Sequence, residues 1–195
     1  MPRNSKLSCS FETQEKIADS LKELMMVKQF EKISVHDIAE NCNIHRQTFY
    51  YHFNDKYELL DWIVDRELVE PFLKGFSLDD VYDRIECIFA SMKKNHLFYQ
   101  NALKINVSDL SRYINKLANV QMFSLINNLR EQRGMNREDT NDILLSSGFI
   151  CYGMAGIVLT WVESGMKDAP AVMAQRIRDV IQSVKKIAEE RKDKE

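Results

Sequence analysis

Two short helices joined by a tight turn are the feature that most limits how this chain can fold. The segment SVHDIAE begins at Ser34 and has the capping-box pattern, in which Ser34 starts a helix and Asp37 reaches back to it. The segment HRQTFYYHF begins at His45 and has Phe49 and Phe53 one helical turn apart, on one side of a second helix. The residues NCN join the two segments, which is the spacing of a helix-turn-helix motif.

Helix start and stop signals recur along the whole 195 residues, and no strand-type alternation competes with them. The sequence therefore predicts an all-α fold of about nine helices. Residues 1–56 are predicted to form a three-helix domain that contains the helix-turn-helix, and residues 57–195 a larger helical domain. A long helix from Asp55 to Leu73 is predicted to join them. The other predicted helix starts are Ser10, Ser77, Ser108, Asn136 and Asp168 with Pro170; a first-helix end is expected near Gln29 and a stop at Gly134.

Composition narrows the function classes. The formal net charge of −2 does not indicate a nucleic-acid partner, so such a partner must be argued from local features. The four cysteines are scattered without a C-x-x-C pair, and the N-terminus has no apolar run of the signal-peptide type. Both observations predict a cytoplasmic protein with reduced thiols.

One stretch, residues 143–162, carries no charge and is long enough to cross a membrane. Acidic residues flank it instead of the Lys and Arg that usually border membrane spans. A buried helix is the favoured interpretation, with a membrane span as the alternative.

The short helix after the turn has an unusual polar face. Opposite Phe49 and Phe53, every residue from Arg46 to Tyr51 that faces outward has a hydrogen-bonding tip, and none is acidic. Such side chains suit duplex DNA, because Arg and Gln pair with base edges while Thr and Tyr hydroxyls reach phosphates. The alternative is that Tyr50 and Tyr51 merely cover a small core.

At this point the segment ISVHDIAENCNIHRQTFYYHFNDKYELLDWIV resembles the N-terminal domain of the TetR family of bacterial transcriptional regulators. The matching features are Ser34, the pair Ile38–Ala39, the run from Tyr50 to Phe53, Lys56 and the pair Leu59–Leu60. The resemblance implies that residues 1–56 form the DNA-binding domain and residues 57–195 the domain for effector sensing and dimerisation. It also implies a homodimer on a palindromic operator. By position it implies DNA contacts from Ser34, His36, Arg46, Gln47, Thr48, Tyr50, Tyr51, His52 and Lys56.

The segment FICYGMAGIVLTWVESGMKDAP is similar to the C-terminal region of a TetR subgroup that includes activators of dihydroxyacetone kinase operons. This resemblance implies an activator that receives its signal from a dihydroxyacetone kinase-like protein. The alternative is a repressor that binds a small apolar effector. Its pocket residues would be Phe89, Met92, Tyr99, Met122, Phe123, Phe149, Tyr152 and Trp161, although such a stripe is more often plain core.

The last helix has apolar residues at alternating spacings of four and three, which predicts a packing seam between subunits. Glycines on the preceding helix would allow close approach of a partner, or close packing within one subunit. The predicted dimer interface is Met173, Ile177, Val180, Val184 and Ile187 with Gly148, Gly153 and Gly156.

No set of residues indicates catalysis. The chain has neither a Gly-rich phosphate loop nor a G-x-S-x-G motif. Cys42, His45 and His52 fall short of the ligand pairs that a zinc site needs, so no metal and no cofactor are predicted. Within the long helix, Trp62 is expected at the junction between the two domains, with a place in the core of the DNA-binding domain as the alternative.

Overall fold

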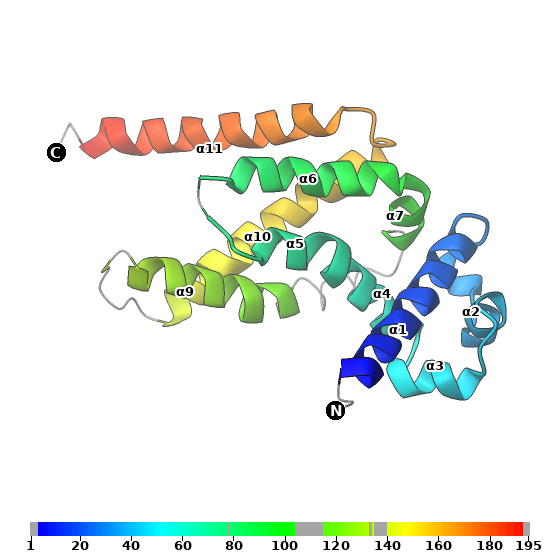
Figure 1. Ribbon diagram of the computed structural model, residues 1–195. Coiled ribbons are helices and arrows are strands. Elements are labelled where there is room, and N and C mark those ends of the chain that lie inside the picture. Colours follow the sequence, from blue (N-terminus) through cyan, green and yellow to red (C-terminus); the bar gives the residue numbers. More distant parts are fainter. Residues whose placement is uncertain (1–3, 78, 104–114, 133, 135–139, 193–195) are drawn as a thin grey trace.

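The computed structural model describes residues 4–77, 79–103, 115–132, 134 and 140–192. In these ranges the chain is helical and contains no strand (Figure 1). When consecutive α and π segments are counted together, these ranges hold nine helices, so the predicted all-α class is confirmed.

The N-terminal part packs three helices around one small core. They are α1 (Asn4–Met25), α2 (Val35–Asn41) and α3 (Arg46–His52), with a short 3₁₀ turn, η1 (Phe30–Lys32), between the first two. Phe30 and Phe49 are fully buried between these helices, together with aliphatic side chains from α1 and α2. The predicted start at Ser10 is wrong because α1 is already helical from Asn4, and α1 ends at Met25, earlier than expected.

The predicted long helix is present, with an interruption. It consists of α4 (Lys56–Val64), a π-helical stretch η2 (Asp65–Val69) and α5 (Glu70–Leu73). Asp55 caps it by accepting hydrogen bonds from the amides of Tyr57 and Glu58. Glu58 accepts from the amide of Asn54 at 2.6 Å, one residue before the position that a capping box requires.

The C-terminal part consists of α6 (Val81–Lys94), α7 (His96–Ala102), the π-helical η3 (Leu117–Met122) continued by α9 (Phe123–Gln132), α10 (Thr140–Glu163) and α11 (Pro170–Lys192). Helices α6 and α11 lie side by side, and α10 crosses behind them (Figure 1). The stop at Gly134 is confirmed by its φ of +63°, and Pro170 begins α11 as expected. Ser77 lies in a turn before α6, which begins later than predicted; the starts at Ser108 and Asn136 fall outside the described residues.

A single apolar core runs through both parts of the chain. It begins between α1 and α3, continues along α4 to Ile63, and reaches α6, α7 and the end of α10. Phe89 and Trp161 meet edge to face within it, with ring centroids 4.9 Å apart. The helix-turn-helix is therefore packed against the C-terminal part, in addition to being joined to it through α4.

Candidate nucleic-acid interface

The turn between α2 and α3 has the geometry that its sequence predicts. Ser34 accepts a hydrogen bond from the amide of Asp37 at 3.1 Å, and the Asp37 carboxylate accepts from the amide of Ser34 at 2.8 Å. Asn43 adopts a φ of +54°, a left-handed conformation that asparagine tolerates better than most residues. The amide of Ile44 then bonds back to Ala39 at 2.9 Å, which closes the turn and starts α3.

Helix α3 presents its polar face to solvent. Phe49 and Phe53 are buried against α1, α2 and α4, as predicted. On the opposite side Tyr50 is 50% exposed and Tyr51 is 81% exposed. This exposure contradicts the alternative that the two tyrosines cover a small core. The other outward residues are Arg46 and Gln47, which are exposed, and Thr48, which is half-buried.

The two histidines predicted at the interface differ in their surroundings. His36 is exposed on α2, with its Nε2 3.8 Å from the carboxylate of Glu40. His52 is half-buried at the end of α3, and its ring lies edge-on to that of Tyr51. Burial lowers the pKa of His52 and so disfavours its charged form.

Lys56 requires a correction. Its ammonium group donates to the carbonyl oxygens of Phe30 at 2.8 Å and Ile33 at 2.8 Å, and to that of Glu31 at 3.1 Å. A lysine has three N–H donors, and all three are used here. Burial lowers the pKa of Lys56, in keeping with this half-enclosed position. Lys56 therefore ties the start of α4 to η1, and it has no donor left for the phosphate contact that the resemblance implied.

The thiol of Cys42 is buried and donates to the carbonyl of Ile38 in its own helix. Burial raises its pKa, which keeps it protonated and unsuited to metal ligation. No grouping of three potential metal ligands occurs among the residues that the structure describes.

The predicted effector-pocket residues do not come together. Phe89, Met92, Tyr99 and Trp161 are buried in the filled core, whereas Phe149 is 81% exposed and Tyr152 is exposed on the same helix, α10. None of the eight residues, Met122 and Phe123 included, lines either of the two main cavities. The stripe of Met and aromatic residues does not indicate a pocket here, because four of its eight members fill the core and two are exposed.

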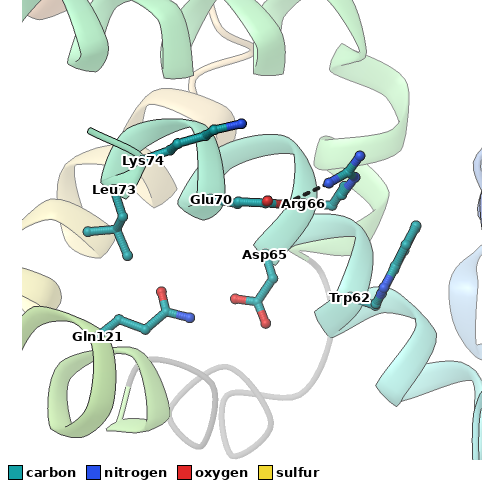
Figure 2. Close-up of a pocket in the computed structure, with 7 residues that line it drawn as sticks. All are labelled: Trp62, Asp65, Arg66, Glu70, Leu73, Lys74 and Gln121. Carbon is teal, nitrogen blue, oxygen red and sulfur yellow. Dashed lines mark hydrogen bonds and ion pairs between the residues drawn. The ribbon is translucent and has the colours of Figure 1, made fainter. Parts of the chain in front are cut away.

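The larger of these cavities, of about 420 Å³ and here called the junction cavity, lies between the long helix α4–η2–α5 and Gln121 of η3 (Figure 2). Trp62 lines it, and the same ring contacts Phe53 at 5.8 Å between centroids, so the expected place of Trp62 at the junction is confirmed. The other lining residues are Asp65, Arg66, Glu70, Leu73, Lys74 and Gln121. The second cavity, of about 330 Å³, is a groove between α5 and α6 with Leu68, Phe72 and Ile88 in its wall.

The predicted dimer residues also separate into two groups. Met173 and Ile177 are buried within the subunit, on a helix that packs along α6, so their assignment to a subunit interface is wrong. Val180, one turn further along α11, is 63% exposed. An added Cβ at Gly148, Gly153 or Gly156 would meet nothing within 4 Å, so no packing inside the subunit requires these glycines. The side chains of Val184 and Ile187 lie outside the described part.

Helix α10 is long and apolar enough to cross a membrane by length and composition, although only 17% of its most apolar window is buried inside the subunit. Its middle and its C-terminal end pack against the rest of the subunit. Cys151 packs against residues of η3, and Trp161 and Val162 belong to the main core. The expectation that this helix is buried on every side within one chain is therefore wrong.

Two side chains connect the domains although no sequence pattern predicts them: Glu67 in η2 and Asn101 in α7. The Glu67 carboxylate accepts from Lys22 of α1 and from the hydroxyl of Tyr99, each at 2.9 Å. Asn101 bonds to the turn after α1. Neither residue belongs to a motif, and contacts across 32 to 76 positions leave no local pattern in a single sequence.

Comparison with known proteins agrees with this geometry. A family model described as bacterial regulatory proteins, tetR family, matches residues 17–63, and one described as transcriptional regulator C-terminal region matches residues 79–183. The chain is 32% identical over 158 residues to the HTH-type dhaKLM operon transcriptional activator DhaS of Lactococcus lactis, which spans 78% of this chain and 79% of that protein.

Two solved structures share the fold. The dihydroxyacetone kinase operon activator DhaS superposes with a TM-score of 0.62 at 21% identity, covering 90% of this chain and 97% of that one. The fatty acid degradation regulator FadR from Bacillus halodurans superposes with a TM-score of 0.55 at 16% identity, covering 86% and 93%. The family matches and the 32% identity extend over both domains, and the chain therefore belongs to the TetR family of bacterial transcriptional regulators, which bind DNA and are not enzymes.

Proposed function

We propose that this protein is a homodimeric activator of a dihydroxyacetone kinase operon, which binds a palindromic operator through α3 and takes its signal from a dihydroxyacetone kinase-like protein. The observation that carries the proposal is the 32% identity to an activator of the dhaKLM operon, because it spans both the DNA-binding and the C-terminal part. The regulator acts on DNA, so we place it in the cytoplasm.

The exposed face of α3 supports base readout by Arg46 and Gln47. Both side chains are exposed on the face opposite Phe49, and the helix carries no acidic residue. A recognition helix of this type enters the major groove with such residues at base edges. Tyr50 and Tyr51 stand beside them, where a phenol hydroxyl reaches phosphate and a ring edge meets a thymine methyl group.

The uncovered face of α10 supports the dimer. Leu145, at 74% exposed, and Phe149 lie on it together with Tyr152 and Ile157. The hydroxyls of Ser146 and Thr160 donate to carbonyls of their own helix. An apolar surface of this extent on a soluble protein indicates a partner. A second copy meeting it across a two-fold axis would cover it on both subunits at once.

On α11, only the outward side fits such an interface. Val180 and Ile181 are exposed, whereas Met173 and Ile177 belong to the core of the subunit. We therefore assign the dimer to the exposed face of α10 with Val180 and Ile181. The glycines at positions 148, 153 and 156 leave open space at their helix surface, which suits close approach of a partner helix.

Two observations favour a protein signal over a small apolar effector. The aromatic residues expected to form an apolar pocket do not enclose one, because Phe89, Tyr99 and Trp161 fill the core while Phe149 and Tyr152 are exposed. The junction cavity is open and has Asp65, Arg66, Glu70 and Lys74 in its lining, which does not suit an apolar molecule.

Selection of bound sequences from random duplexes tests the DNA-binding part of the proposal. The selected site, placed upstream of a reporter gene, should raise transcription when the regulator and a dihydroxyacetone kinase-like subunit are both expressed. Repression by the regulator alone, relieved by a small molecule, would support the alternative and overturn the proposed activator.

A further inference from the structure

We propose that Asn101, on α7 of the C-terminal part, is a positioning residue for operator binding: it holds the turn after α1 and so fixes how the helix-turn-helix is presented to DNA. The inference rests on the proposed operator binding by α3.

The side-chain amide of Asn101 is fully used by the DNA-binding domain. Its Nδ2 donates to the carbonyl of Met25 at 3.0 Å and also to that of Lys28, and its Oδ1 accepts from the amide of Phe30 at 3.1 Å. These partners lie 71 to 76 positions away. Two carbonyls can only accept and an amide can only donate, so the orientation of the Asn101 side chain follows from its partners. Any residue without both functions breaks the arrangement.

These hydrogen bonds hold the C-terminal end of α1 and the turn that follows it. Met25 is the last residue of α1, where helix carbonyls lack partners within the helix. Asn101 supplies one of those partners from another domain. The segment that it holds leads directly into η1 and then into the capped start of α2.

The contact between Phe30 and Lys56 connects the segment held by Asn101 to the recognition helix α3. The carbonyl of Phe30 accepts from Lys56, whose ammonium group also lies 4.6 Å from the centre of the Phe30 ring. Lys56 begins α4, four residues after the end of α3. Asn101 and Lys56 thus hold the same residue, Phe30, from the two sides, and Phe30 is fully buried between them.

Helix α7 makes a further contact with the DNA-binding domain through Glu67. The hydroxyl of Tyr99, two residues before Asn101, donates to Glu67, which also pairs with Lys22 on α1. Tyr99 is buried, and burial raises its pKa far above the usual range, so its hydroxyl stays a donor. Helix α7 is thus linked to α1 at two places, directly through Asn101 and through Glu67. The helix-turn-helix therefore moves with α7 as one unit, and its orientation does not depend on α4 alone.

Orientation matters only when two DNA-binding domains must meet two half-sites together. The full-length variant Asn101→Leu removes the hydrogen bonds with little change in volume. If the two DNA-binding domains of this variant adopt the orientation that binds the operator about a tenth of the time, its apparent Kd for the full operator rises about tenfold. Its affinity for a duplex with one half-site should stay at the wild-type value. Asn127→Leu is the matched control. Among the described residues, the amide of Asn127 bonds to Glu131 in its own helix and not to the DNA-binding domain, so this variant should bind both duplexes normally.

Hydrogen exchange of the Phe30 amide gives a readout that needs no DNA. The amide should exchange slowly in the wild type and in the control, and faster by at least about tenfold in Asn101→Leu. If Asn101→Leu does not fold, Asn101→Asp is the variant to test. It keeps the oxygen that accepts from the Phe30 amide and loses the hydrogen bonds donated to the carbonyls of Met25 and Lys28. It should therefore protect the amide and still bind the full operator more weakly than the wild type.

Wild-type affinity of Asn101→Leu for the full operator would overturn the positioning role. Equal losses on the half-site and the full operator would also overturn it, because they indicate damage to the DNA-binding domain itself. If the wild type shows no sequence preference, the proposed operator binding is wrong. Fast exchange of the Phe30 amide in the wild type would show independently that Asn101 does not hold this amide.

Discussion

The rings of Phe49 and Tyr50 meet edge to face with their centroids 5.6 Å apart, one fully buried and the other half exposed. Adjacent residues on a helix point about 100° apart, so this pair marks the boundary between the inner and outer faces of α3. The inner face fixes α3 in the domain. The outer face is left to carry the DNA contacts.

Replacing Arg46 or Gln47 by Ala should cost about 1–3 kcal/mol of operator binding and relax specificity at one base position. Both side chains are exposed, so the free energy of unfolding should stay within about 0.5 kcal/mol of the wild-type value. Competition binding with single-base variants of the operator measures the effect. Uniform weakening on every base variant would contradict base readout by these residues.

Replacing Lys56 should affect the stability of the fold and not the salt dependence of DNA binding. Lys56→Met keeps the aliphatic stem and removes the hydrogen bonds that the ammonium group donates to three carbonyls, which should lower the free energy of unfolding by about 2 kcal/mol. The dependence of operator affinity on salt concentration should keep its slope, because no phosphate contact is lost. Chemical denaturation and binding at several salt concentrations test this together. If Lys56→Met flattened the salt dependence of operator affinity and left the free energy of unfolding unchanged, Lys56 would instead be a phosphate contact.

The capping box at α2 predicts a dependence on pH. The hydrogen bond from the Ser34 side chain, followed by that from its amide, lowers the pKa of Asp37 from 3.8 to about 2. Because the pKa is lowered in the folded state, the charged Asp37 stabilises the fold above about pH 4, and this contribution is lost as the pH falls through about 2. Ser34→Ala should raise the pKa of Asp37 toward 3.8, measured by NMR titration of its carboxyl group. An unchanged pKa would show that the cap is not its cause.

The dimer assignment is tested by a matched pair of variants. Phe149→Asp places a charge on the exposed face of α10 and should give a folded monomer, because an unpaired charge is not tolerated in an apolar interface. Ile177→Asp places a charge in the core against α6 and should unfold the subunit instead. Light scattering and thermal unfolding separate the two results. A dimeric Phe149→Asp, or a monomeric wild type, would contradict the assignment.

The fluorescence of Trp62 should report the signal. Its ring contacts Phe53 of the DNA-binding domain and lines the junction cavity beside residues of α5 and η3, so a change in domain orientation alters its surroundings (Figure 2). Titration with a dihydroxyacetone kinase-like subunit should shift the emission and change operator affinity together, and candidate metabolites alone should do neither. A shift with a metabolite alone would favour a small-molecule effector at this cavity.

Local signals in the sequence were sufficient for the helix-turn-helix. Ser34 with Asp37, Phe49 with Phe53, and Asp55 at the start of α4 each act within one helical turn, and all of them take the positions that their spacing predicts. The start of α1 was missed because Ser10 is a good capping residue, but nothing in its vicinity breaks the helix.

The C-terminal part was less predictable for a physical reason. A helix without charges, such as α10, has no polar side, so its sequence does not tell which face is covered by its own chain. Phe149 was therefore placed in a pocket although it is exposed, and Ile177 at a subunit interface although it is buried. Asn101 and Lys56 act on backbone groups far away in the sequence, and such contacts depend on the tertiary fold.

The most direct test of the central claim is selection of duplex DNA by the purified full-length protein, followed by the same selection with Arg46→Ala. The account predicts a palindromic consensus for the wild type, with half-site centres about 34–36 Å apart or at a longer repeat of that spacing. It predicts that Arg46→Ala loses preference at one position in each half-site. Recovery of sequences without a consensus, or a consensus that Arg46→Ala leaves unchanged, would contradict the assignment of α3 as the recognition helix.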